Sequence, residues 1–259
     1  MSPLLPPVDP TPSTGEATTM TTDEAEPSAA NATLSPRLLA AAHDGDVSSR
    51  RAGLRRLADA TRALIEGLVG TDVDEDTVTA TADALEQLAA AFDRGGPHSM
   101  YDGIAESAMA GADPAAFFDQ SPMLGKANPL APPIRVEVLD DVVVGRVTFG
   151  SAYEGPPGCV HGGYVAAAFD EILGAAQTFS GAPGMTGTLT VRYRKPTPLH
   201  TELRVEGRFD RREGRRVYTT GQIFAGDVLT AEAEGIFVSI DIEKFLQLRE
   251  DRDARFGPD

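Results

Sequence analysis

The sequence has little that could support metal or disulfide chemistry. It contains one cysteine, four histidines and no tryptophan in 259 residues. The lone Cys159 excludes an internal disulfide and a zinc–cysteine cluster, and the histidines are scattered without the spacing of metal ligands. No apolar run reaches the roughly 20 residues that a membrane-spanning helix needs. We therefore expect neither a metal site nor a membrane partner.

Positive charge is also scarce, because 23 Lys and Arg residues stand against 39 Asp and Glu, a formal net charge of −16. This balance argues against nucleic acid or an anionic membrane as the main partner. The N-terminus has no basic segment followed by an apolar core, so no signal peptide is predicted. The apolar content of 41% is typical of soluble globular proteins, and a cytoplasmic location is the simplest expectation.

The first third of the chain divides by composition. Residues 1–34 are rich in Pro and Thr and contain five acidic residues but no Lys or Arg. Such a segment cannot bury enough apolar surface to fold, so we predict a disordered tail that can be removed without loss of activity. Residues 35–95 have helical patterns and are predicted to form a separate helical extension.

Two helices are predicted within the extension. Ser48 or Ser49 can cap the start of the first, and Gly70 can end it. The second begins near Asp74, and together the two predict an antiparallel helical hairpin. The hairpin could pack against the sheet or a neighbouring subunit, or serve as a lid for the substrate. The largely apolar stripes at helical spacing comprise Leu54, Leu57, Thr61, Leu64, Ile65 and Leu68 in the first helix and Val78, Ala82, Leu85, Leu88, Ala89 and Phe92 in the second.

The pattern changes to strands in the second half. Residues 96–133 form an irregular segment with scattered Gly, Pro and Asn. A domain at 134–250 follows, with a strand hairpin first, an apolar helix next and four β-rich segments after it. Strands that enclose one long helix indicate an α+β fold. The predicted strands are residues 134–138, 142–149, 187–193, 202–209, 216–224 and 230–240, and a short terminal helix is expected at 242–250.

The central segment, residues 156–177, carries the features that point to chemistry. A Gly- and Pro-rich loop leads into His161-Gly162-Gly163, and an almost wholly apolar helix follows. The first N–H groups of a helix lack internal acceptors and lie at the positive end of its dipole. Glycines leave that backbone accessible to a ligand. The arrangement suits an oxyanion hole, although a plain turn before a core helix would look the same.

A carboxylate lies farther along the same helix. Asp170 is nine positions after His161 and therefore about 13 Å along the helix axis, too far to reach the helix start in its own chain. Two such helices that run antiparallel across a two-fold axis would bring Asp170 of one chain near Gly162 of the other. The spacing predicts a shared site and an obligate dimer.

The segment resembles hotdog-fold acyl-CoA thioesterases of the phenylacetate-pathway and mammalian thioesterase-superfamily types. The resemblance is carried by the Glu-Gly-Pro-Pro-Gly-x-Val-His-Gly-Gly pattern at 154–163, by Asp170 nine residues after the His, and by a second block at 185–199. It covers roughly residues 122–241. It implies a hotdog fold, in which an antiparallel sheet wraps around a central helix, here with an N-terminal helical hairpin added. It also implies hydrolysis of acyl-CoA to free acid and CoA by a homodimer or a dimer of dimers, without a cofactor other than the CoA of the substrate.

The resemblance implies roles for single residues. Asp170 would be the general base or the nucleophile, and these two alternatives stay open. The Gly162 N–H would hold the oxyanion, with Gly163 beside it at the substrate. His161 would fix the turn by a hydrogen bond to a loop carbonyl, with acid–base chemistry as the alternative role. Thr186 would orient water or the carboxylate, unless it is only a hydroxyl at the start of a strand.

Other residues are weaker candidates. The cluster of Arg192, Arg194 and Lys195 could bind CoA phosphates or could be solvated. Glu171 lies about 100° around the helix from Asp170 and is interpreted as a dimer contact. Cys159 has no partners that would make it a nucleophile.

Two other functions stay open. One is a non-catalytic hotdog protein that binds acyl-CoA in a regulatory role. The other is a hotdog dehydratase or hydratase, which would need a catalytic histidine paired with the acid. Some members of the resembled family have Asn six residues before the His, whereas this chain has Gly155. The substrate carbonyl would then have one polarising donor fewer.

Overall fold

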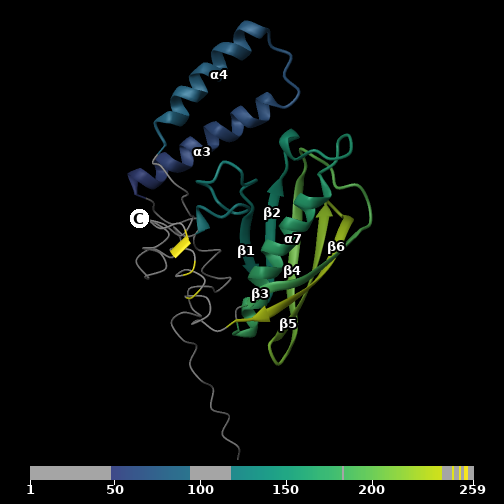
Figure 1. Ribbon diagram of the computed structural model, residues 1–259. Coiled ribbons are helices and arrows are strands. Elements are labelled where there is room, and N and C mark those ends of the chain that lie inside the picture. The colour runs from purple at the N-terminus through teal and green to yellow at the C-terminus, as the bar shows by residue number, and fades with distance from the viewer. Residues whose placement is uncertain are drawn as a thin grey trace, which may run out of the picture.

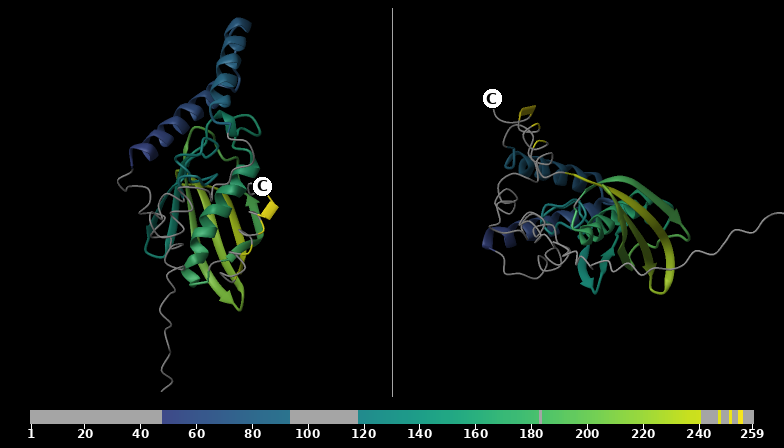
Figure 2. Two further views of the ribbon diagram at one scale, coloured as in Figure 1. Left: turned by 60° about the vertical axis from the view of Figure 1, so that its left-hand side comes forward. Right: turned by 90° about the horizontal axis from the view of Figure 1, so that it is seen from below.

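One antiparallel sheet of six strands curves around helix α7 (Gly162–Ala176). The computed structural model describes residues 48–93, 118–182 and 184–240, and also 247, 251, 254 and 255. Figure 2 shows the sheet's curvature, with α7 inside the concave side. The strand order is β1-β2-β4-β5-β6-β3, and the hotdog fold is confirmed. The strands are β1 (Arg135–Leu139), β2 (Val142–Thr148), β3 (Gly184–Tyr193), β4 (Glu202–Glu213), β5 (Arg216–Ala225) and β6 (Val228–Ser239).

The strands form where apolar and polar residues alternate. β5 shows this clearly, because its Val217, Thr219, Gly221 and Ile223 are buried while most residues between them are more exposed. Tight turns join β1 to β2, β4 to β5 and β5 to β6. The chain has positive φ in each of them, at Asp140, Gly214 and Gly226. The predicted hairpins are therefore confirmed.

A row of small residues gives α7 its seat on the sheet. Gly207 of β4 pairs with Gly221 of β5, which pairs with Ala233 of β6. A Cβ atom at Gly207 would lie 2.8 Å from Ile172 Cγ2, and one at Gly221 would lie 3.0 Å from Leu173 Cδ2. The missing side chains let the helix approach the sheet closely.

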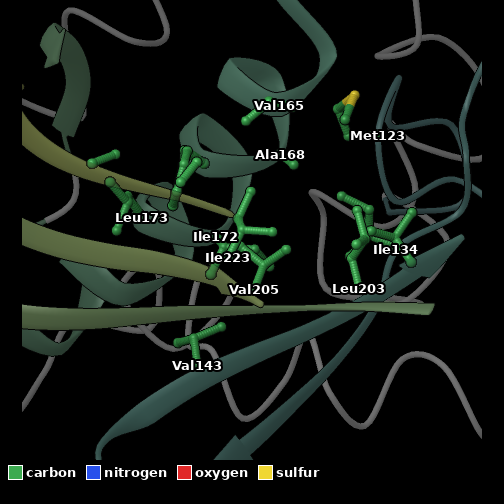
Figure 3. Close-up of a cluster of buried hydrophobic side chains, with 14 of the residues drawn as sticks. Met123, Ile134, Val143, Val165, Ala168, Ile172, Leu173, Leu203, Val205 and Ile223 are labelled. Carbon is green, nitrogen blue, oxygen red and sulfur yellow. The ribbon is translucent and has the colours of Figure 1, made fainter. Parts of the chain in front are cut away.

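The core lies between α7 and the concave face of the sheet (Figure 3). Both Ile172 and Leu173 are fully buried there. The loop before β1 adds Leu124 and Ile134 at one end of the core. The largest buried side chains also include Phe149, Phe169, Phe237, Leu203, Ile223, Val143, Val165 and Val205.

The predicted extension contains two helices, α3 (Ser49–Leu68) and α4 (Glu75–Ala90). Ser48 caps α3 and Asp74 caps α4 through their side chains, as predicted. Figure 1 shows that α4 runs back along α3 after a short connection, which confirms the predicted helical hairpin. No residue of α4 is buried in the structure as described. The expected tail at 1–34 and the first part of the irregular segment, 96–117, lie outside the described residues, and so does the expected terminal helix apart from residue 247.

The helix α3 docks through a stripe that combines charged residues with part of the predicted apolar one. Leu54, Leu64 and Ile65 are half-buried, and Arg51 and Ala58 are buried, whereas Leu57 and Leu68 are exposed. Arg51 and Arg55 both bond the carboxylate of Asp119. The apolar pattern is thus confirmed in part, and it did not indicate the arginines, because an arginine satisfied by a buried carboxylate can face a protein surface as well as a leucine can.

None of the helices in the described ranges combines the length and apolar character required to cross a membrane.

Candidate active site

The start of α7 presents one backbone N–H that has no partner among the described residues. His161 is the N-cap residue, and its Nδ1 accepts a hydrogen bond from the Gly163 N–H at 3.1 Å. The N–H groups of Tyr164 and Val165 donate to the His161 carbonyl. The Gly162 N–H makes no hydrogen bond to any described residue and lies at the positive end of the helix dipole. Gly162, rather than Gly163, is therefore the candidate donor for a developing oxyanion.

The ring of His161 positions the turn, but through a different partner from the predicted loop carbonyl. Its Nδ1 atom is occupied as an acceptor, which requires an unprotonated nitrogen there. The Gly163 N–H is occupied by the same bond, so Gly163 offers the substrate only its exposed, side-chain-free surface.

The loop before α7 is held by a dense set of backbone bonds. Glu154 pairs with Val160 as an antiparallel bridge, and the His161 N–H donates to the Tyr153 carbonyl at 2.8 Å. Inside the loop, a Cβ atom at Gly155 would lie 2.7 Å from His161 Cα. An Asn at position 155 therefore has no room in this loop conformation.

Tyr193 lies at the helix start, a position that the sequence analysis missed. Its hydroxyl donates to the Gly162 carbonyl at 2.9 Å. A Cβ atom at residue 162 would lie 3.2 Å from the same hydroxyl oxygen. The residue belongs to the second resembling block at 185–199, but nothing in the sequence indicates that the end of β3 meets the start of α7.

The structure brings Asp170 and Thr186 together. The Thr186 hydroxyl donates to Asp170 Oδ1 at 2.7 Å, and both residues are exposed. The bond occupies one carboxylate oxygen and leaves Oδ2 available to a water molecule or a substrate. A bulge in the β3–β6 pairing between Thr186 and Thr188 aims the Thr186 side chain at α7, because a bulge shifts the alternation of side chains by one residue.

Glu171 follows Asp170 and is half-buried. Burial, and after it the neighbouring charge of Asp170, raises its pKa to about 7. Glu171 is therefore partly protonated near neutral pH.

The basic cluster on β3 is not brought to this site. Leu189 and Val191 pack against the core, so Arg192 lies on the opposite face of the sheet. It pairs there with Glu234, and Arg194 pairs with Glu232. Lys195 is exposed just beyond the strand. Cys159 is half-exposed in the loop before α7, and its Sγ lies 3.5 Å from the Pro157 carbonyl.

Gly162 begins α7, whereas Asp170 lies in the middle of the same helix. The two residues are eight positions apart, which is about 12 Å of helix rise. One chain thus contains two separate half-sites, the Gly162 N–H with Tyr193 at the helix start and the Asp170–Thr186 pair farther along the helix. Among the described residues, no cluster of His, Cys, Asp and Glu is arranged to hold a metal ion.

The sheet and α7 define a hotdog protein. The Gly162 N–H and the Asp170 carboxylate, which Thr186 holds, are the half-sites expected of a hydrolase. Comparison with known proteins gives the family. The thioesterase superfamily model matches residues 157–232. A crystal structure of a thioesterase superfamily protein superposes with a TM-score of 0.60 at 33% identity, and the match covers 71% of this chain and 94% of that one. The chain belongs to the thioesterase superfamily.

Curated relatives match over the same part of the chain. Acyl-coenzyme A thioesterase THEM4 of Xenopus laevis is 37% identical over 93 residues, which are 35% of this chain and 42% of the relative. The Mus musculus protein of that name is 34% identical over 97 residues, covering 37% of this chain and 42% of the relative. The alignments thus span less than half the length of these relatives.

Proposed function

We propose that this protein is an acyl-CoA thioesterase whose active site is assembled from two chains. The observation that carries the proposal is the separation of the two half-sites along α7, with Gly162 at its start and Asp170 in its middle. The family membership and the names of the curated relatives support the substrate class. The reaction converts an acyl-CoA and one water molecule into a free acid and CoA.

The strand β3 supports the pairing of two chains. It is an edge strand of the described sheet, so one of its sides has hydrogen-bonding groups that no described strand occupies. Its large side chains Met185 and Tyr193 are 53% and 55% exposed. Because Thr186 lies near its start and Tyr193 at its end, antiparallel pairing of two β3 strands places Asp170 of one chain beside Gly162 of the other.

In the assembled site, the Gly162 N–H holds the thioester carbonyl oxygen. Asp170, as a general base, accepts a proton from water while the water oxygen attacks the carbonyl carbon. Negative charge develops on the carbonyl oxygen, and the Gly162 N–H with the helix dipole stabilises it. The tetrahedral intermediate then collapses, the carbon–sulfur bond breaks, and the CoA thiolate leaves and takes up the proton.

The same geometry allows Asp170 to attack the carbonyl itself. The Thr186 bond fixes Oδ1, so Oδ2 would form an anhydride with the acyl group, which water then hydrolyses. A single turnover in ¹⁸O-labelled water separates the two routes. Direct water attack puts the label only in the free acid, whereas hydrolysis of an anhydride by attack on the aspartyl carbon leaves it in Asp170.

The function is tested with a panel of acyl-CoAs of different chain length and a reagent that detects free thiol. We expect release of CoA from at least one of them, saturable in substrate. Saturable binding of acyl-CoA without CoA release would instead identify a binding protein and contradict the proposed hydrolysis.

A further inference from the structure

The carboxylate of Glu66, on the last turn of α3, enters the loop that precedes α7. Its Oε1 accepts from the Ser151 N–H at 2.8 Å and its Oε2 from the Ala152 N–H at 3.3 Å. These N–H groups begin the 3₁₀ helix η1 (Ser151–Tyr153), which has no cap from its own preceding residue Gly150. Hydrogen bonds from the backbone, that of Ser151 foremost, lower the pKa of Glu66. Glu66, a residue of the N-terminal extension, therefore caps a helical turn that lies between β2 and α7.

The loop is shaped to receive this carboxylate. A Cβ atom at Gly150 would lie 2.9 Å from the Glu66 Cδ atom, so a side chain there would displace Glu66. On the other side, the Ser151 hydroxyl lies 3.1 Å from His200 Nε2, and the His200 N–H donates to the Phe149 carbonyl at 2.8 Å. The Glu66 carboxylate thus fills the space beside Gly150, next to the loop after β2 that His200 holds from the other side.

A short chain of contacts leads from Glu66 to the oxyanion donor. The turn that Glu66 caps ends at Tyr153, whose carbonyl accepts from the His161 N–H at 2.8 Å. The Tyr153 ring packs edge-on against Tyr164 in the first turn of α7, with centroids 4.8 Å apart. Burial raises the pKa of Tyr153 to about 12, so its hydroxyl stays protonated and donates to the Leu130 carbonyl. Tyr153, the residue next to the Glu66 contacts, therefore contacts both His161, directly before Gly162, and Tyr164, two residues after it.

Other bonds keep α3 on the body of the protein independently of Glu66. Arg62, one turn earlier, donates to the Asn128 and Lys126 carbonyls at 2.7 and 3.0 Å. Arg51 and Arg55 hold Asp119 at the other end of the helix. Since these contacts do not involve η1, removing Glu66 should release the loop without releasing the helix.

We infer that the N-terminal extension takes part in the active site, and that Glu66 is a positioning residue that sets the Gly162 N–H through η1 and Tyr153. The kinetic consequence rests on the proposed thioesterase function. Loss of Glu66 lowers kcat more than it raises KM, because the oxyanion bond strengthens as charge develops in the transition state. A misplaced donor costs roughly tenfold to a hundredfold in rate.

The test compares Glu66→Ala and Glu66→Gln with two control variants, Arg55→Ala on α3 and Glu86→Ala on the exposed helix α4. We expect a kcat loss of at least about tenfold for Glu66→Ala. Glu66→Gln should fall between Glu66→Ala and the wild type, because its amide keeps one oxygen acceptor. Arg55→Ala should lower the melting temperature with kcat unchanged, and Glu86→Ala should change neither.

Hydrogen–deuterium exchange tests the positioning without any substrate. In Glu66→Ala, the amides of His161 and Gly163, which do not touch Glu66, should exchange severalfold faster than in the wild type. An absence of CoA release by the wild type would refute the proposed function, and the exchange measurement would still decide the positioning. Unchanged exchange at His161 and Gly163, wild-type kcat in Glu66→Ala, or an equal kcat loss in Arg55→Ala would each overturn the inference.

Discussion

Thr186 determines what the two oxygens of Asp170 can do. A carboxylate with one oxygen fixed by a short hydroxyl bond, 2.7 Å here, keeps a defined orientation although both residues are exposed. The free oxygen then points in a constant direction, which general base and nucleophilic catalysis both require. An exposed aspartate without such a partner would sample several rotamers.

Replacement of Asp170 by Asn tests this residue directly. Asp170→Asn is nearly isosteric and removes the negative charge, so it should lower kcat by at least about a hundredfold, the lower range for lost acid–base catalysis. Steady-state hydrolysis of the best acyl-CoA measures the loss. A melting temperature and an oligomeric state like those of the wild type would show that the fold is unaffected, and near-wild-type turnover would exclude Asp170 from the mechanism.

Glu171 predicts a stability change that depends on pH. Its pKa is raised from an ordinary value near 4.5 to about 7, so between these values the folded chain holds a proton that the unfolded chain has lost. The stability from this proton is fully present below about pH 4.5 and is lost as pH rises through about 7. Glu171→Gln cannot lose a proton. Its melting temperature, relative to that of the wild type, should therefore be higher at pH 8 than at pH 5, and a difference independent of pH would contradict the raised pKa.

At the scale of elements, α7 is positioned by what the sheet lacks. Side chains are missing at Gly207 and Gly221, directly beneath the helix. The site benefits from this contact, because one rigid helix carries both the Gly162 N–H and Asp170. A helix that sat farther from the sheet would also lose the bond between Asp170 and Thr186 on β3.

A methyl group added at residue 207 tests how closely α7 packs on the sheet. Gly207→Ala places Cβ 2.8 Å from Ile172 Cγ2 and 3.0 Å from the Ile172 carbonyl oxygen, and overpacking of this kind costs about 1–3 kcal/mol. Urea denaturation should show that loss. Gly53→Ala in α3, where no atom lies within 4 Å of the added methyl, is the control and should be neutral or slightly stabilising. Equal stabilities for the two variants would mean that α7 does not pack tightly on the sheet at Gly207.

The elements could be predicted from the sequence better than their contacts. Alternation and capping residues located the strands and α7, and Ser48 and Asp74 marked the helix starts, because these signals are local. The contact of Tyr193 with Gly162 joins residues 31 positions apart and depends on the β3 register. The docking stripe of α3, with Arg51, Arg55 and Glu66, was missed because only apolar periodicity was sought.

On the scale of the whole molecule, the proposed site requires a second chain to bring the two half-sites together. A substitution of Gly162 can test this requirement. Gly162 is the first residue of α7, a position where proline is well tolerated and where it removes only an N–H that has no helical partner. The preceding residue, His161, has φ −59° and ψ 134°, a conformation that proline permits in its neighbour. Gly162→Pro should thus remove the oxyanion donor with little effect on the helix.

Two inactive variants, Gly162→Pro and Asp170→Asn, should restore activity to each other if the site is shared. Random pairing after joint unfolding and refolding makes about half of the dimers mixed. In each mixed dimer one site carries both changes and the other carries neither, so activity should return to about a quarter of the wild-type value. Gly162→Ala keeps the N–H and should retain measurable activity, although its methyl lies 3.2 Å from the Tyr193 hydroxyl. If mixed dimers form and remain inactive while Gly162→Ala is active, the two half-sites do not meet across the dimer, and the proposed antiparallel placement of the two α7 helices is wrong.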